Sequence, residues 1–169
     1  YPSVNASLVL SDIFELPTNI SFWKLRASAA GVGGGGKRPY LNSYTYPRAT
    51  NFPGGAFNPT SIPDENLTFE NKISYELGTE FRMFRNRAKL DLTVYKGYNI
   101  NQIIETPIDP SSGYRNQIIN GGKVSNQGIE IELNGDIIKK PDGFSWSMFG
   151  NYTAFDTKIE DLPVMDAEK

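Results

Sequence analysis

Apolar and polar side chains take turns along the stretch Lys72-Ile73-Ser74-Tyr75-Glu76-Leu77-Gly78-Thr79-Glu80-Phe81-Arg82-Met83. Successive side chains of a β-strand point to opposite faces, so this alternation predicts a strand with one apolar and one polar face. The pattern stops at residues 84–87 and resumes at residue 88. Two strands joined by so short a connection form an antiparallel hairpin. Each predicted strand is about twice as long as the usual strand of roughly 5–6 residues.

Strands of this length and pattern are typical of membrane-spanning β-barrels. A strand needs about 9–11 residues to cross a bilayer and alternates apolar and polar side chains as it does so. The mean hydropathy of −0.42 does not oppose this interpretation, because half of each barrel strand is polar. The sequence has no run of about 18 apolar residues, which excludes a transmembrane helix. The sequence therefore predicts an all-β fold of antiparallel up-and-down strands, a segment of a large transmembrane β-barrel with long extracellular loops.

Long and short connections also alternate along the chain. Further strands are predicted at residues 4–10, 22–30, 88–104, 124–137 and 144–157. Long loops are predicted at about residues 31–66 and 107–121, and short turns at residues 85–87 and 139–143. The glycine run from residue 31 to 36 is expected to end regular structure. Residues 1–169 are predicted to be a single partial barrel segment, and the first residues show no signal-peptide pattern.

Composition excludes several classes of function. The chain has no cysteine and no histidine, which rules out disulfides, thiol nucleophiles, histidine-based triads and histidine-ligated zinc sites. A net charge of −2 without a basic run gives no reason to expect nucleic-acid binding. We expect no enzyme activity, no catalytic residue, no metal site and no cofactor.

Two patterns imitate catalytic or binding motifs. Residues 31–37 match the frame of a phosphate-binding loop, but Arg38 and Pro39 follow where a magnesium-binding hydroxyl and a helix should stand. We interpret the segment as a flexible glycine-rich loop. Four carboxylates at strand spacing could support glycoside hydrolysis, although a solvated barrel interior is the favoured interpretation: Glu76, Glu80, Glu130 and Glu132.

Aromatic side chains concentrate in the predicted loops. Such side chains can stack on sugar faces, and neighbouring amides can bind hydroxyl groups. The alternatives are packing of the loop against itself and an aromatic girdle at the membrane interface. The candidate substrate-binding residues are Tyr40, Tyr44, Tyr46, Phe52, Phe57, Tyr114 and Asn116.

Several segments, taken in order, resemble one family. The stretch Ile20-Ser21-Phe22-Trp23-Lys24-Leu25-Arg26-Ala27-Ser28 with its following glycines resembles a segment of SusC/RagA-type TonB-dependent outer-membrane transporters. Similar matches fall on Tyr75-Glu76-Leu77-Gly78-Thr79-Glu80, on Leu90-Asp91-Leu92-Thr93-Val94-Tyr95 and on Gly122-Lys123-Val124-Ser125-Asn126-Gln127-Gly128-Ile129-Glu130. The resemblance covers nearly the whole chain.

This resemblance implies a function in the outer membrane of a Gram-negative bacterium. Such transporters are 22-strand barrels that import oligosaccharides, or in some members peptides, with energy from TonB and a SusD-like surface lipoprotein as a lid. The chain is expected to be a fragment without the plug domain and without the segment that contacts TonB. The strand positions with apolar side chains would contact membrane lipid, and the alternate positions with polar side chains would line the interior. The alternative is a soluble extracellular β-sandwich module that binds carbohydrate, in which two sheets bury their apolar faces against each other.

Overall fold

The computed structural model describes residues 1–36 and 38–162. Lys37 of the phosphate-loop frame and residues 163–169 of the predicted barrel segment lie outside the described residues. The described chain forms seven strands and two short 3-10 turns. The strands are β1 (Ser3–Val9), β2 (Ile20–Gly34), β3 (Ser61–Ile62), β4 (Glu70–Met83), β5 (Ala88–Pro107), β6 (Asn116–Ile138) and β7 (Trp146–Asp161). The turns are η1 (Leu10–Asp12) and η2 (Pro110–Ser112).

The strands form one sheet in the order β1-β2-β4-β5-β6-β3, and β7 also pairs with β6. Strands β1 and β2 pair antiparallel, with Ser3 opposite Ala30 and Val9 opposite Lys24. The two-residue strand β3 is the exception, because it pairs parallel with Asn116 and Gln117 of β6. The predicted all-β, up-and-down architecture is confirmed. No helix within residues 1–36 or 38–162 is long and apolar enough to cross a bilayer.

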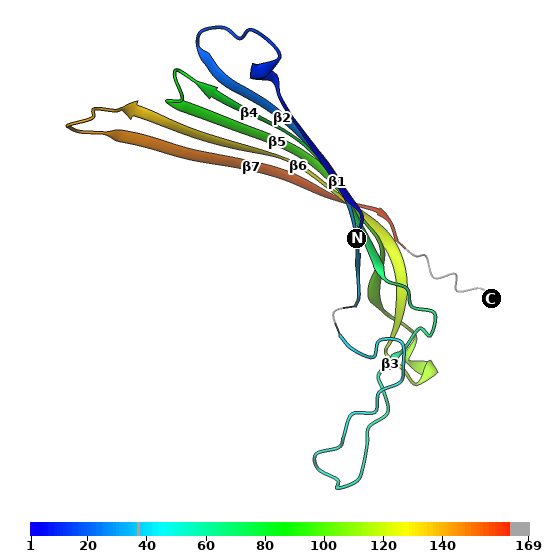
Figure 1. Cartoon of the computed structure of the whole chain (residues 1–169). Coiled ribbons are helices and arrows are strands. Elements are labelled where there is room, and N and C mark those ends of the chain that lie inside the picture. The colour runs from blue at the N-terminus through cyan, green and yellow to red at the C-terminus, as the bar shows by residue number, and fades with distance from the viewer. Residues whose placement is uncertain (37, 163–169) are drawn as a thin grey trace. The chain divides into compact units, whose positions relative to one another are not determined.

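Chain contacts divide the molecule into two compact units. The first consists of residues 1–32, 73–98 and 125–158, and the second of the described residues within 33–72, 99–124 and 159–162. In the first unit, segments of six strands lie side by side (Figure 1). Strand β7, of which residues 146–158 belong to this unit, is a sheet edge that pairs with β6 on one side. The second unit contains the long connections and β3.

Little of either unit is sealed from solvent. Among the described residues, Leu10 and Ile118 are the buried hydrophobic side chains, each 6% exposed. Leu77 is 54% exposed and Val94 is 41% exposed, while Ile73 is of intermediate exposure. A soluble protein of this size normally buries such side chains in a core. An exposed apolar sheet face is instead expected where hydrocarbon replaces water.

The prediction that the glycine run ends regular structure is wrong, because strand β2 extends into this run. The strand continues to Gly34, and the Gly31 N–H donates to the Pro2 carbonyl oxygen over 2.8 Å. A Cβ atom at Gly33 would lie 3.1 Å from Cδ2 of Phe69. Glycine therefore lets the Phe69 ring approach the backbone closely, as strand glycines often do, and does not end the strand.

Strand β6 likewise begins earlier than predicted, at Asn116 instead of residue 124. Gly122, which suggested a loop, has φ of +81° and lies within the strand. Glycine has no Cβ atom and adopts this backbone conformation without steric cost, so it does not have to end the strand. The connection after β5 is thus residues 108–115, shorter than the predicted range.

The short turns agree better with expectation. Three residues between β4 and β5 have positive φ: Phe84, Arg85 and Asn86 at 55°, 60° and 63°. Neighbouring chain segments hold this turn in place. The Phe84 N–H donates to the Asn19 carbonyl, and the Asp136 N–H donates to the Arg87 carbonyl over 2.7 Å.

Candidate functional site

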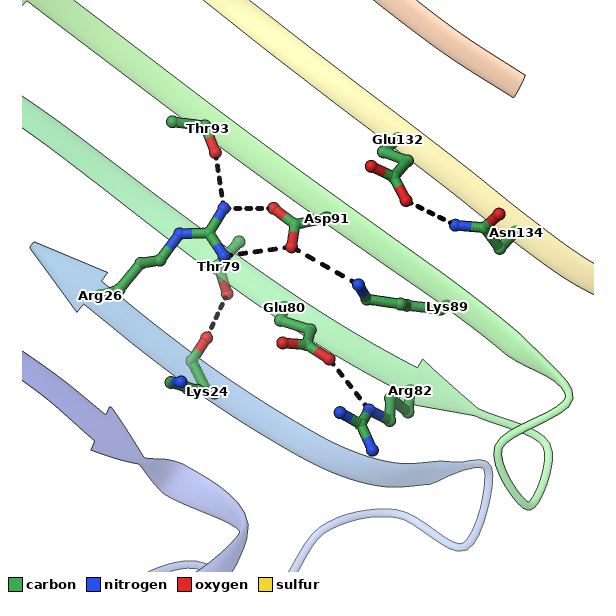
Figure 2. Close-up of polar contacts among 10 residues, drawn as sticks. All are labelled: Lys24, Arg26, Thr79, Glu80, Arg82, Lys89, Asp91, Thr93, Glu132 and Asn134. Atoms are coloured by element: carbon green, nitrogen blue, oxygen red, sulfur yellow. Dashed lines mark hydrogen bonds and ion pairs between the residues drawn. The ribbon is translucent and has the colours of Figure 1, made fainter. Parts of the chain in front are cut away.

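The first unit has a charged sheet face, which we call the polar face and define by Arg26, Gly78 and Asp91. Arg26 on β2 donates to both carboxylate oxygens of Asp91 on β5, over 3.1 and 2.5 Å, and to Thr93 Oγ1 over 2.8 Å (Figure 2). Strand β4 lies between β2 and β5 in the sheet. The guanidinium therefore passes over the intervening strand to reach its carboxylate partner.

Gly78 on β4 makes this crossing possible. A Cβ atom there would overlap Arg26 Nε and lie 2.9 Å from Cγ and 3.0 Å from Cζ of the same side chain. A second glycine on this face has the same relation to its neighbour. A Cβ atom at Gly128 on β6 would lie 2.5 Å from Tyr95 Oη, so the tyrosine from β5 covers that glycine. Side chains that cover strand glycines fix the register of neighbouring strands.

Further ion pairs follow the polar face. Glu80 accepts from Arg82 Nε over 2.9 Å, and Lys89 lies 4.0 Å from Asp91 (Figure 2). Glu132 accepts from Asn134 Nδ2 over 2.7 Å. The predicted carboxylates are thus paired with cations or amides at two positions, Glu80 and Glu132. This arrangement is typical of a solvated protein surface that carries charges of both signs, rather than of an isolated pair of catalytic carboxylates.

The opposite face of the same strands, the apolar face, holds a different set of contacts. Trp23 stacks on Phe81 with ring centroids 5.3 Å apart, and its Nε1 donates to Thr79 Oγ1 over 3.0 Å. Thr79 in turn donates to the Lys24 carbonyl over 3.3 Å. The indole N–H and the hydroxyl are both satisfied between β2 and β4, so they can face an apolar medium at low cost.

In the second unit, Glu105 connects three segments of the chain. Its carboxylate accepts from Arg38 Nη2 over 2.5 Å, from Ser61 Oγ over 2.6 Å and from Asn116 Nδ2 over 3.1 Å. These hydrogen bonds, led by those from Ser61 and Arg38, lower the pKa of Glu105. The long loop before β4 is therefore tied to the ends of β5 and β6.

Asn120 on β6 forms a second tie. Its side-chain oxygen accepts from the Thr68 N–H over 2.6 Å, and its Nδ2 donates to the carbonyls of Thr68 and Asn101 over 2.9 and 3.0 Å. Asn101 has φ of 56° within β5. One amide thus holds the entry to β4 and an irregular point of β5 together.

The predicted substrate-binding residues lie in four different surroundings. Tyr44 and Tyr114 come together, with ring centroids 6.2 Å apart, and Tyr40 lines a cavity of about 270 Å³ in the loops. Asn116 is engaged by Glu105. The remaining three are exposed and form no ring pair within the described residues: Tyr46 at 62%, Phe52 at 72% and Phe57 at 59%.

Sequence reasoning missed the residues that organise the loops. Glu105, Arg38 and Asn120 carry no motif, and their partners lie 11 to 67 positions away. The Arg26–Asp91 pair was easier to predict, since both residues stand at strand positions with polar side chains. The signal for it is Gly78, the one position without a side chain on the polar face of β4, the strand that lies between β2 and β5.

An open antiparallel sheet with a charged face and an exposed apolar face defines the class of transmembrane β-barrel walls. The model of one family, described as TonB dependent receptor-like, beta-barrel, matches residues 1–167. The chain belongs to this family, a family of receptors and transporters in the outer membrane of Gram-negative bacteria. The resemblance drawn from the sequence is confirmed.

Two relatives from Formosa agariphila are TonB-dependent receptor P3 and TonB-dependent receptor P26. They are 28% and 27% identical over 85% and 98% of this chain, which spans 15% and 17% of their lengths. Among solved structures, the RagAB peptide transporter matches with a TM-score of 0.82 at 21% identity, over 95% of this chain and 18% of that one. The "closed-closed" RagAB peptide importer matches with a TM-score of 0.83 at 19% identity, over 96% and 18% of the two chains. The solved structures establish the shared fold.

Proposed function

We propose that this chain forms part of the wall of an outer-membrane transporter that imports oligosaccharides or peptides. The observation that carries the proposal is the division of one sheet into a polar face with ion pairs and an exposed apolar face. The spanning segments are the strands of the first unit, with the apolar face toward lipid and the polar face toward the transport path. Both substrate classes stay in the proposal, since the solved relatives are peptide transporters and the loop aromatics suit sugars.

The partners follow from the same assignment. A surface lipoprotein of the SusD type closes the barrel from outside, and TonB supplies the energy for transport. The loops of the second unit, tied at Glu105 and Asn120, face the outside of the cell and contact substrate or the lid. The exposed aromatic side chains of the long loop are suited to contact a partner, because aromatic side chains are enriched at interfaces: Tyr40, Tyr46, Phe52 and Phe57.

The alternative of a soluble β-sandwich fits the structure less well. A sandwich needs a second sheet to bury the apolar face of the first. The described residues form one sheet, and Leu77 and Val94 on its apolar face are 54% and 41% exposed.

Site-specific labelling tests the proposed orientation. This chain has no cysteine, so single cysteines can be introduced at Phe52 in the long loop and at Asn86 in the short turn of the full-length protein, after any cysteine elsewhere is replaced. A membrane-impermeant maleimide should label F52C on intact cells and N86C only after the outer membrane is permeabilised. Labelling of N86C on intact cells at the F52C rate would reject the orientation.

Uptake tests the transport function itself. A strain without the full-length protein should lose uptake of a labelled oligosaccharide or a labelled peptide, and the wild-type gene should restore it. The substrate that loses uptake identifies the class. Unchanged uptake, in the strain without the protein, of every oligosaccharide and peptide that the wild type takes up would reject a transport role.

A further inference from the structure

The second unit contains a cavity of about 400 Å³, and none of the predicted substrate-binding residues lines it. Asn116 is connected to it only indirectly, because it donates a hydrogen bond to the lining residue Glu105. This volume lies within the roughly 300–1,000 Å³ of small-molecule sites. Three kinds of side chain line it: the charged Arg38, Glu70 and Glu105, the amides Asn99 and Gln102, and the apolar Leu41, Ile103, Ile104 and Ile118.

The charge that Arg38 brings to this cavity is already used. Its Nη2 donates to Glu105, whose carboxylate also accepts from Ser61 and Asn116. Two opposite charges in contact largely cancel each other's electrostatic attraction for a ligand. Three donors also fill most of the acceptor sites of the Glu105 carboxylate. Arg38 and Glu105 therefore form the frame of the cavity and offer little to a ligand.

Glu70 is different. Its Oε1 accepts from the Ile103 N–H over 2.9 Å, and this is its one hydrogen bond within residues 1–36 and 38–162. The second carboxylate oxygen has no donor in the described part of the chain. The side-chain amides of Asn99 and Gln102 likewise have no hydrogen-bond partner among the described residues. The described lining thus keeps one negative charge and three side chains with acceptor capacity.

We propose that this cavity binds a primary ammonium group, with Glu70 as its counter-ion. An ammonium group has three N–H donors and no acceptor, which matches one carboxylate oxygen and two amide oxygens. The apolar lining would receive the carbon atoms next to the nitrogen. The group can belong to a free peptide amine or to an amino sugar, and so the inference rests on the proposed import function and makes its substrate class narrower.

Calorimetric titration of the purified full-length protein in detergent tests this inference. The probes are a tetrapeptide with a free amine and its N-acetylated form, and a glucosamine tetramer and its N-acetylated form. At neutral pH at least one amine probe should bind about tenfold more tightly than its acetylated counterpart, because hydrogen bonds to charged groups are stronger than neutral ones. Preference for the peptide amine or for the amino sugar then identifies the source of the group.

Glu70→Gln is the decisive variant. It keeps an oxygen for the Ile103 N–H but removes the charge, so the tenfold preference for amines should disappear. Glu65→Gln, at an exposed loop position outside the cavity lining, should keep the preference. Gln102→Met removes an acceptor at similar volume and should weaken amine binding about threefold, which tests the same geometry with the charge intact.

The results separate this inference from the proposed function. Equal binding of amine and acetylated probes, absence of binding of all four, or a full preference in Glu70→Gln would each overturn the ammonium site. Loss of uptake in the deletion strain together with any of these results would leave the transporter standing without the site. An amine preference that depends on Glu70, in a protein whose deletion leaves uptake unchanged, would support the site and reject transport.

Discussion

Gly78→Ala is expected to weaken the sheet by breaking a contact between two strands that are not neighbours. The new Cβ atom would overlap Arg26 Nε and force the guanidinium away from Asp91 and Thr93. Hydrogen bonds to charged groups contribute about 1.5–3 kcal/mol when well shielded. The Arg26 side chain is 41% exposed, so solvent screening reduces the loss to about 1–2 kcal/mol.

Replacing glycine in a strand also has a favourable part, which must be subtracted. Alanine loses less conformational freedom on folding, and this is worth about 0.5–1 kcal/mol. The net destabilisation of Gly78→Ala is therefore about 1 kcal/mol. Gly150→Ala is the matched control, because a Cβ atom at Gly150 on β7 meets no atom within 4 Å. That variant should be neutral or slightly more stable than wild type.

The assay is urea unfolding of the full-length protein in detergent, followed by tryptophan fluorescence and evaluated as a free energy of unfolding. Arg26→Ala and the double variant complete a thermodynamic cycle. Once Arg26 is gone, only the favourable part remains, so Gly78→Ala should stabilise the protein by about 0.5–1 kcal/mol. The coupling energy between the two positions is then the lost contact itself, about 1–2 kcal/mol. Additive effects of the two substitutions, or equal stability of Gly78→Ala and Gly150→Ala, would refute the proposed crossing.

Three further predictions test other parts of the structure. Leu77→Lys should impair insertion into vesicles more than Glu80→Leu, since a charge on the lipid face costs roughly 2–4 kcal/mol at the midplane; equal insertion would refute the assignment of faces. Asn120→Ala should raise protease cleavage near Thr68 by removing the amide that ties the loop, and unchanged cleavage would contradict that role. The pKa of Glu105 is lowered on folding, so its contribution to loop stability is present above the ordinary glutamate pKa and is lost as the pH falls through the lowered value. Hydrogen exchange of the loop should therefore be faster below pH 4 than at pH 7 after correction for intrinsic rates, and Glu105→Gln should reduce this difference.

The strands could be predicted because one physical rule governs them. A strand that separates lipid from water must alternate, and residues 72–83 and 88–95 show the alternation without interruption. The rule fails at the ends of strands, where glycine is ambiguous. Gly33 and Gly122 suggested loops, but one accommodates the Phe69 ring and the other adopts a positive φ within β6.

The organisation of the loops could not be predicted, for a different reason. The role of Glu105 can be identified only from its hydrogen bonds with Arg38 and Ser61, which lie 67 and 44 positions away in the sequence. No local periodicity encodes such contacts, because they depend on how loops fold back over strand ends. The predicted loop aromatics show the same limit. Tyr44 and Tyr114 meet, whereas the position of Phe52 relative to any ligand stays a prediction.

Strand β7 has a further consequence for handling this chain. It offers 16 residues of extended backbone that hydrogen-bond to β6 on one side, and its exposed Phe149 and Phe155 are 65% and 75% accessible. Such a border recruits any complementary extended segment, including the same border of another molecule. Residues 1–169 expressed alone should consequently form fibrillar or amorphous aggregates when detergent is diluted, and a synthetic peptide able to zip onto β7 should suppress them.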